Sequence, residues 1–334
     1  MTVQPFLPGG WLFRRRLHFG AAVCVATMLV CLAAEAAQEK NDKDDEKEGP
    51  PKAEEVVLPV GDGLELAATY FPGSEGKDSV PVVLLHMWKR SRNDYKELAP
   101  FLQRKGYAVL VPDLRGHGDS TTISTGTKVE TLDAAKMSAR QFPLMVTQDM
   151  KAVKDFLWDR NNAKELNLDK LCVVGAEMGA SVALQFALYD AVGYDNNRVW
   201  YGPLKLGEFV KGLVLISPKW SFRGLKLTPV FAHPKVRSNI SVLIMVGEGN
   251  SKAVSDARRI HKIFKRYHPE PDPDQKTQQK TLFFGRMKTS LQGTKMLGEG
   301  LNVEKFIAMF IDQRLVKSTE SKKFTWKERK RPHQ

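Results

Sequence analysis

The chain has 334 residues, a formal net charge of +13 and three cysteines. Its length is sufficient for one large hydrophobic core or two small ones, and the absence of an apparent sequence repeat excludes a repeat architecture. Cys24 and Cys31 lie in an N-terminal segment that we expect to be removed, so Cys172 alone remains, which excludes an internal disulfide and a cysteine-rich zinc cluster.

The first 36 residues have the layout of a secretory signal peptide. Three arginines at 14–16 precede an apolar run over residues 17–34, which ends in small residues with Ala34 and Ala36 spaced as a cleavage site. We therefore predict a secreted or periplasmic protein. The alternative is a membrane anchor through residues 17–34, because about eighteen apolar residues are at the lower limit for spanning a bilayer.

Charged segments flank the body of the chain. Residues 37–54 are rich in Lys, Asp and Glu and contain a Pro-Pro pair, which predicts a disordered linker. Residues 317–334 carry seven Lys or Arg against two Glu, which predicts a basic disordered tail. An alternative role for this tail is binding to an anionic envelope surface, with Phe324 and Trp326 as interfacial groups. No nucleic-acid-binding motif accompanies the tail, so nucleic acid is not an expected partner.

Strand-like and helix-like patterns alternate from residue 55 to 316. Residues 54–60 and 64–71 alternate in polarity around a Gly-Asp-Gly turn, which predicts a hairpin. Apolar runs predict further strands at residues 80–87, 107–113, 170–175, 210–218, 240–247 and 280–285. Amphipathic patterns predict helices at residues 93–106, 144–160, 179–191, 252–268 and 303–315. This alternation predicts one α/β domain with a mostly parallel sheet and helices on both faces.

Three blocks of this body carry a family resemblance. Residues 82–120 contain "HMW" after one strand and "DLRGHGDS" after the next. Residues 173–187 read "VVGAEMGASVALQFA", and the last two strands continue into "GEGN" and "TSLQG". In order and spacing these blocks resemble the α/β-hydrolase superfamily, particularly small-cap esterases and dienelactone-hydrolase-like or serine-aminopeptidase-like members. The resemblance implies an α/β-hydrolase fold with a nucleophile between two glycines at a sharp turn.

The resemblance also implies positions for a catalytic triad, and all three are replaced. Glu177 stands at the nucleophile position, Asn250 at the acid position and Gln292 at the histidine position. No histidine occurs in residues 269–332, where the family's base is expected. Glu248 is the one nearby substitute for the acid. The triad is therefore identified as degenerate.

Further family positions concern the oxyanion hole and two histidines. The resemblance places backbone amides of the hole at Met178 and around Met87 or Trp88. Met87 replaces a glycine of the family at this loop, which bears on the loop conformation. His86 and His117 occupy positions that are structural in relatives, and we expect them to be structural in this chain.

Three roles for Glu177 follow. It fills a silent site, it acts as nucleophile in a non-standard hydrolase of small esters or amides, or it binds a ligand. Amides at the other two triad positions cannot take up a proton at neutral pH, which favours a site without catalysis. We therefore predict an exported α/β-hydrolase-fold protein without hydrolase activity, which binds a small molecule or a protein of unknown identity. No cofactor and no metal site are indicated.

Overall fold

In a computed structural model of the chain, the described residues are 49–193, 207–272 and 279–330. Residues 50–334 group into one compact unit. The predictions for the signal peptide or anchor and for most of the linker fall outside the described residues. In the described part, no helix combines the length and the apolar character that crossing a bilayer requires.

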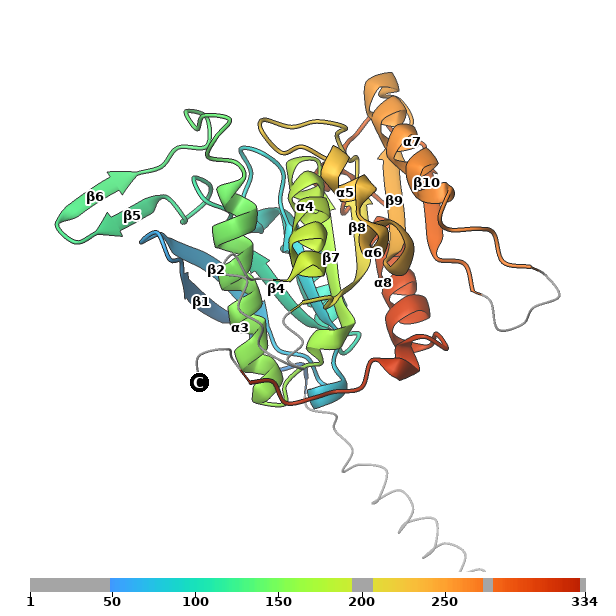
Figure 1. The fold of residues 1–334 in the computed structure, drawn as a ribbon, viewed down its shortest axis with the longest axis horizontal. Coiled ribbons are helices and arrows are strands. Elements are labelled where there is room, and N and C mark those ends of the chain that lie inside the picture. Colours follow the sequence, from blue (N-terminus) through green and yellow to red (C-terminus); the bar gives the residue numbers. More distant parts are fainter. Residues whose placement is uncertain (1–48, 194–206, 273–278, 331–334) are drawn as a thin grey trace, which may run out of the picture. The chain divides into compact units, whose positions relative to one another are not determined.

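An eight-stranded sheet runs through the domain in the order β1-β2-β4-β3-β7-β8-β9-β10 (Figure 1). Its strands are β1 (Glu54–Pro59), β2 (Glu65–Phe71), β3 (Pro81–Leu85), β4 (Ala108–Pro112), β7 (Leu171–Ala176), β8 (Val210–Ile216), β9 (Ser241–Gly247) and β10 (Leu282–Met287). β2 pairs antiparallel with β1 and β4, and the other pairs are parallel. This is the α/β-hydrolase architecture, and the predicted N-terminal hairpin and mostly parallel sheet are confirmed.

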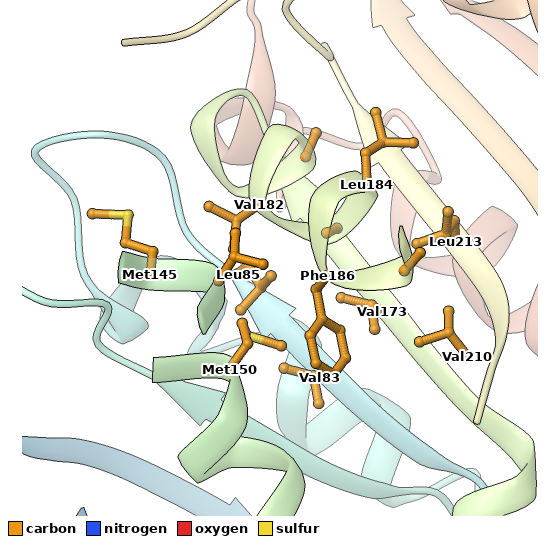
Figure 2. Close-up of a cluster of buried hydrophobic side chains, with 14 of the residues drawn as sticks. Val83, Leu85, Met145, Met150, Val173, Val182, Leu184, Phe186, Val210 and Leu213 are labelled. Carbon is orange, nitrogen blue, oxygen red and sulfur yellow. The ribbon is translucent and has the colours of Figure 1, made fainter. Parts of the chain in front are cut away.

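Helices cover both faces of the sheet, as a sheet of buried parallel strands requires. They are α2 (Leu98–Gln103), α3 (Met150–Asn162), α4 (Met178–Val192), α5 (Thr228–Ala232), α6 (Pro234–Asn239), α7 (Ser251–Lys265) and α8 (Val303–Ile311). One core joins α3, α4 and α7 to the sheet, and a second core joins α2 and α8 to the opposite face. In the first core, Phe186 and Val182 of α4 lie over Val83 and Val173 (Figure 2).

Two elements differ from the predictions. The helix predicted at 93–106 is a 3₁₀ turn (Arg92–Tyr95) followed by the short helix α2. A small hairpin of β5 (Thr122–Thr125) and β6 (Lys128–Thr131) was not predicted, and it extends away from the main sheet (Figure 1). Its strands are mostly exposed, so no apolar run marks them in the sequence.

The C-terminal segment packs against the domain as far as the described residues extend. Arg329 is buried and forms an ion pair of 2.6 Å with Asp169. Trp326 Nε1 donates a hydrogen bond of 3.0 Å to the Asn161 carbonyl at the end of α3. The prediction of a disordered tail is therefore corrected for residues 317–330, because the segment supplies partners to buried polar groups of the domain.

Candidate functional site

Glu177 occupies a sharp turn between β7 and α4. Its backbone has φ 47° and ψ −101°, which a non-glycine residue adopts only under strain. A Cβ at Gly175 would lie 2.3 Å from the Gly179 carbonyl oxygen, and a Cβ at Gly179 would lie 2.2 Å from the Leu85 carbonyl oxygen. Strand and helix thus approach so closely that only glycine fits on either side, and the turn holds Glu177 at the carboxyl end of the sheet.

The Glu177 carboxylate is paired with a lysine of the loop after β8. Lys219 Nζ lies 2.5 Å from Glu177 Oε2, and 22 % of the Glu177 side chain is exposed. Lys219 was not predicted as a site residue. The pair places a positive and a negative group in contact at this turn, so the carboxylate is not free to act alone.

Gln292, at the position of the missing histidine, is held by hydrogen bonds at both ends of its amide. Its Oε1 accepts from Ser217 Oγ (2.8 Å), and its Nε2 donates to the Gly247 carbonyl (2.9 Å). Ser217 Oγ in turn accepts from the Gly293 amide (2.9 Å). Glu177 Cγ lies 3.3 Å from the place where a Gly293 Cβ would be. The loop of Gln292 therefore packs against the sharp turn at Glu177, which we call the elbow.

The structure does not bring Asn250 or Glu248 into this group. Asn250 is the N-cap of α7, and its side chain accepts a hydrogen bond of 3.0 Å from the amide three residues later. Glu248 is paired with Arg286 at 3.6 Å. Within the described residues neither side chain bonds to Gln292 or Glu177. Ser217, which was not predicted, takes the place next to Gln292 instead.

The predicted oxyanion positions lie beside the elbow. Met178 begins α4, so its backbone N–H lacks an acceptor within the helix and is available at the site. Met87 is buried, and its sulfur is 2.1 Å from the position of the Cβ that Gly293 lacks. Trp88 is partly buried and donates from Nε1 to the Ala134 carbonyl (3.2 Å). The Met87 side chain therefore fills space next to Gly293. By the family resemblance, the position of Met87 is occupied by a glycine, which has no side chain to fill that space.

His86 and His117 are structural, as their contacts show. His86 Nδ1 donates to the Met87 carbonyl (2.7 Å) and Nε2 accepts from the Leu114 amide (3.0 Å), which fixes its tautomer. Burial, together with the neighbouring His117, lowers the pKa of His86 to about 4. Burial also lowers the pKa of His117, whose Nδ1 donates to the Arg115 carbonyl (3.0 Å). Neither ring lies in contact with Glu177.

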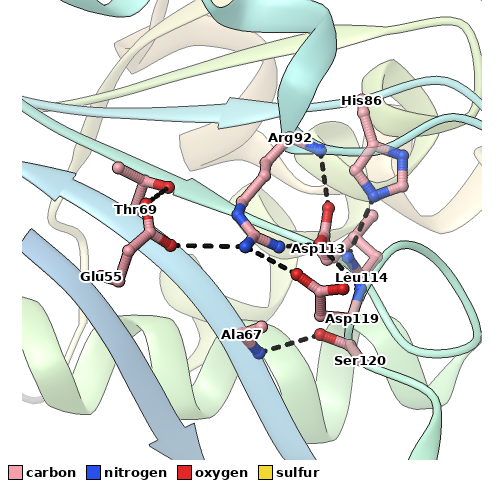
Figure 3. A network of polar contacts seen from close by, with 9 residues as sticks. All are labelled: Glu55, Ala67, Thr69, His86, Arg92, Asp113, Leu114, Asp119 and Ser120. Carbon is pink, nitrogen blue, oxygen red and sulfur yellow. Dashed lines mark hydrogen bonds and ion pairs between the residues drawn. The ribbon is translucent and has the colours of Figure 1, made fainter.

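The "DLRGHGDS" block likewise forms a structural network (Figure 3). Asp113 accepts hydrogen bonds from the Arg92 amide (2.6 Å) and the Asp119 amide (3.0 Å), and it pairs with the Arg92 guanidinium. Ser120 Oγ accepts from the Ala67 amide (2.9 Å), which ties the loop to β2. In the described part of the chain, no group of three or more His, Cys, Asp or Glu is placed to hold a metal ion.

Comparisons with known sequences give partial matches. Residues 80–240 match the model of the alpha/beta hydrolase fold family. A soluble epoxide hydrolase of Corynebacterium sp. (strain C12) is 33 % identical over 154 residues, which cover 46 % of this chain and 43 % of that protein. A non-heme chloroperoxidase of Burkholderia pyrrocinia is 42 % identical over 50 residues, which cover 15 % of this chain and 18 % of that protein. The chain thus spans less than half the length of these curated relatives.

Solved structures match over most of the domain. A dienelactone hydrolase from Anabaena variabilis aligns with a TM-score of 0.52 at 14 % identity, over 78 % of this chain and 97 % of that one. EstE1, a carboxylesterase cloned from a metagenomic library, aligns with a TM-score of 0.53 at 14 % identity, over 79 % and 90 %. At these identities the likeness shows the fold alone. Together with the sequence match over residues 80–240, it shows that the chain has the α/β-hydrolase fold.

Proposed function

We propose that the protein binds a ligand or partner at the Glu177 site and does not hydrolyse esters or amides. One observation supports this above the others. The side chain at the nucleophile position is a carboxylate in contact with Lys219, and the side chain at the base position is an amide engaged by Ser217 and Gly247.

Hydrolysis by this fold requires a base that takes a proton from the nucleophile or from water and gives it to the leaving group. The Gln292 amide has no basic lone pair at neutral pH, and both of its ends are occupied. The Glu177 carboxylate is partly neutralised by the ammonium group of Lys219, which weakens it as a nucleophile. The site therefore has the shape of a hydrolase centre without its proton relay.

The experiment is a comparison of 4-nitrophenyl acetate hydrolysis by the wild type, Glu177→Gln and the control Glu248→Gln. Glu248 is a suitable control because it is a nearby paired carboxylate outside the site. We expect all three proteins to give the rate of the uncatalysed reaction. Turnover by the wild type and Glu248→Gln that Glu177→Gln abolishes would contradict the proposal.

A second function, hydrolysis with Glu177 as the attacking group, is favoured by the strained elbow and the partial exposure of the carboxylate. A Glu177 oxygen would attack the ester carbonyl carbon, and the alcohol would leave with a proton from Lys219. Water would then cleave the resulting anhydride, so that the acyl group leaves as a free carboxylic acid, the remaining proton of the water returns to Lys219 and Glu177 is again a carboxylate. Rapid acid quench followed by peptide mass spectrometry tests this route: an acyl adduct on Glu177 supports it, and its absence excludes accumulation of that intermediate.

We also propose that the protein is exported, on the basis of residues 1–36 of the sequence. The test is expression of the full chain in a bacterial host, with fractionation and determination of the N-terminus. A mature chain that begins at residue 37 supports cleavage, and an intact chain in the membrane fraction supports the anchor. An intact chain confined to the soluble cytosolic fraction would contradict both.

A further inference from the structure

Two cations share one tryptophan ring at the edge of the Glu177 site. Lys89 Nζ lies 4.7 Å from the centre of the Trp88 ring, and the Arg223 guanidinium carbon lies 4.2 Å from it. Phe222 meets the same ring edge-on at 6.1 Å, and Lys219 Nζ is 5.7 Å from the Phe222 ring. These contacts connect the Trp88 ring to the Glu177–Lys219 pair, so the cations and the silent site belong to one surface.

Within the described residues, no carboxylate forms an ion pair with Lys89 or Arg223. The acidic groups near them are engaged elsewhere: Glu177 pairs with Lys219 at 2.5 Å, Asp94 with Arg90 at 2.6 Å and Asp133 with Lys136 at 3.7 Å. The surface around Trp88 therefore carries uncompensated positive charge, which attracts an anion.

The backbone that presents these cations is strained. Lys89 has φ 59° and Arg223 has φ 26°, values that side chains other than glycine rarely adopt. Among the described residues, seven non-glycine residues have positive φ, and four of them (Lys89, Glu177, Ser217 and Arg223) belong to this site. Lys89 and Arg223 both lie in tight turns closed by backbone hydrogen bonds. The Arg90 amide donates to the Met87 carbonyl (3.2 Å) and the Leu225 amide to the Phe222 carbonyl (2.7 Å), so the turns hold the two cations in place beside Trp88.

A cleft adjoins Trp88 on the side of Lys89. Its volume is about 750 Å³, and its walls are the loops at residues 89–96, 116–118 and 133–135. The cleft is lined by two carboxylates, each of which forms an ion pair with a neighbouring cation, and by further positive and neutral polar groups. The carboxylates are Asp94 and Asp133, the positive groups are Lys89, Arg90 and Lys96, and the neutral groups include Ser91 and Asn93. A cleft of this size is within the range that takes small organic ligands.

We propose that this surface binds a small organic anion, whose carboxylate or phosphate group is attracted by the two cations on the Trp88 ring and whose body extends into the adjoining cleft. The proposal rests on the proposed function, because a site that binds without turnover needs recognition groups rather than a proton relay. Arg223 fits this role because a guanidinium group can stack on an aromatic ring and still donate paired hydrogen bonds to a planar anion.

The test is isothermal titration of the full protein with benzoate and phenyl phosphate, with benzyl alcohol as the neutral control. We expect at least one anion to bind about tenfold or more tightly than the alcohol, and raised salt to weaken that binding. Tighter binding of benzoate identifies a carboxylate ligand, and tighter binding of phenyl phosphate identifies a phosphate ligand. Equal affinity for all three compounds, or no binding of either anion, would overturn the proposal.

Matched variants assign the site. The double variant Lys89→Gln/Arg223→Gln should lose about tenfold or more in anion affinity, since it removes both cations that attract the anion. Lys252→Gln/Lys280→Gln removes the same charge from lysines that pair with Asp256 and Glu270, and it should bind within about twofold of wild type. Equal losses in both double variants would show a nonspecific charge effect and contradict the site.

The outcomes separate this proposal from the absence of hydrolysis. Benzoate has no scissile ester, so its binding is independent of turnover. Hydrolysis of 4-nitrophenyl acetate together with benzoate binding that depends on Lys89 and Arg223 would refute the silent site and keep the anion site. No hydrolysis and no anion binding would keep the silent site and refute the anion site. Because Lys89 and Arg223 are exposed, their substitution should leave the thermal melting curve unchanged.

Discussion

The packing of the C-terminal segment gives a quantitative prediction for Arg329→Ala. The Arg329 and Asp169 side chains are only 5 % and 8 % exposed, and they form an ion pair of 2.6 Å. The guanidinium also lies 4.5 Å from the centre of the Phe209 ring. Removal of one partner of a buried ion pair typically costs about 3–5 kcal/mol, because the other charge stays buried without compensation.

We expect the lower end of this range, a loss of about 3 kcal/mol in the free energy of unfolding, because Asp169 has a further interaction besides the ion pair with Arg329. For a domain of this size, that loss corresponds to a fall of about 6–12 °C in Tm. Thermal and urea unfolding followed by circular dichroism measure both quantities. The matched control is Lys330→Ala, the exposed next residue, for which we expect a change of less than about 0.5 kcal/mol.

The reasoning is refuted if Arg329→Ala and Lys330→Ala have the same stability within about 0.5 kcal/mol. A double-mutant cycle with Asp169→Ala separates the ion pair from the ring contact, because the coupling energy of the cycle reports the pair. Truncation after residue 323 should cost more than Arg329→Ala, since it also removes hydrogen bonds from the segment to the domain. The side chains that bond to residues 324–329 are those of Trp158, Asn161, Asn162 and Asn167.

Three further predictions concern the site and its surroundings. Burial lowers the pKa of His86 from 6.5 to about 4, so between these pH values the unfolded chain binds a proton that the folded chain does not, and the free energy of unfolding should fall as the pH is lowered from 6.5 to 4. Urea unfolding at a series of pH values should show that this free energy depends less steeply on pH in His86→Gln than in the wild type. Asn250→Ala should lose about 1 kcal/mol of stability by chemical unfolding, because it removes the cap of α7. The triple variant Glu177→Ser/Ser217→Asp/Gln292→His should hydrolyse 4-nitrophenyl acetate faster than the triple variant Glu177→Ser/Asn250→Asp/Gln292→His. The reason is that Ser217 forms a hydrogen bond with Gln292, whereas Asn250 does not.

The fold could be predicted because its signals are local and redundant. Strands β3, β4, β7 and β9 are buried along their whole length, and each is a continuous apolar run in the sequence. The elbow could be placed because Gly175 and Gly179 are required by a backbone approach that no other residue permits. The hairpin β5–β6 was missed for the opposite reason, since its exposed strands have no face to bury.

The site was only partly predictable, because its partners come from loops whose approach depends on the folded sheet. Lys219 could not be assigned to the site from the sequence, because its contact with Glu177 depends on where the loop after β8 lies in the folded domain. Asn250 has the spacing of the family's catalytic acid, but asparagine is also a favoured N-cap residue of helices. Capping of α7 explains the hydrogen bond that the Asn250 side chain forms. The high charge of the C-terminal segment predicts a solvated tail, so the burial of Arg329 could not be predicted. Its buried partner Asp169 lies 160 residues earlier in the chain, and no local pattern indicates the contact.

The strain in the site bears on whether it is silent or used for binding. A residue held in a sparsely populated backbone region costs of order 1–3 kcal/mol, and Glu177 and Ser217 both have positive φ at the carboxyl ends of central strands. The close packing of β7 and α4 imposes this conformation on Glu177, so the elbow keeps its shape whichever side chain it carries. Lys89 and Arg223 have positive φ for a different reason, because each lies in a tight turn that a backbone hydrogen bond closes. Their backbone thus follows from local turns, and the support for a ligand at this surface is the charge of the two cations on the Trp88 ring, with which no carboxylate of the described residues forms an ion pair.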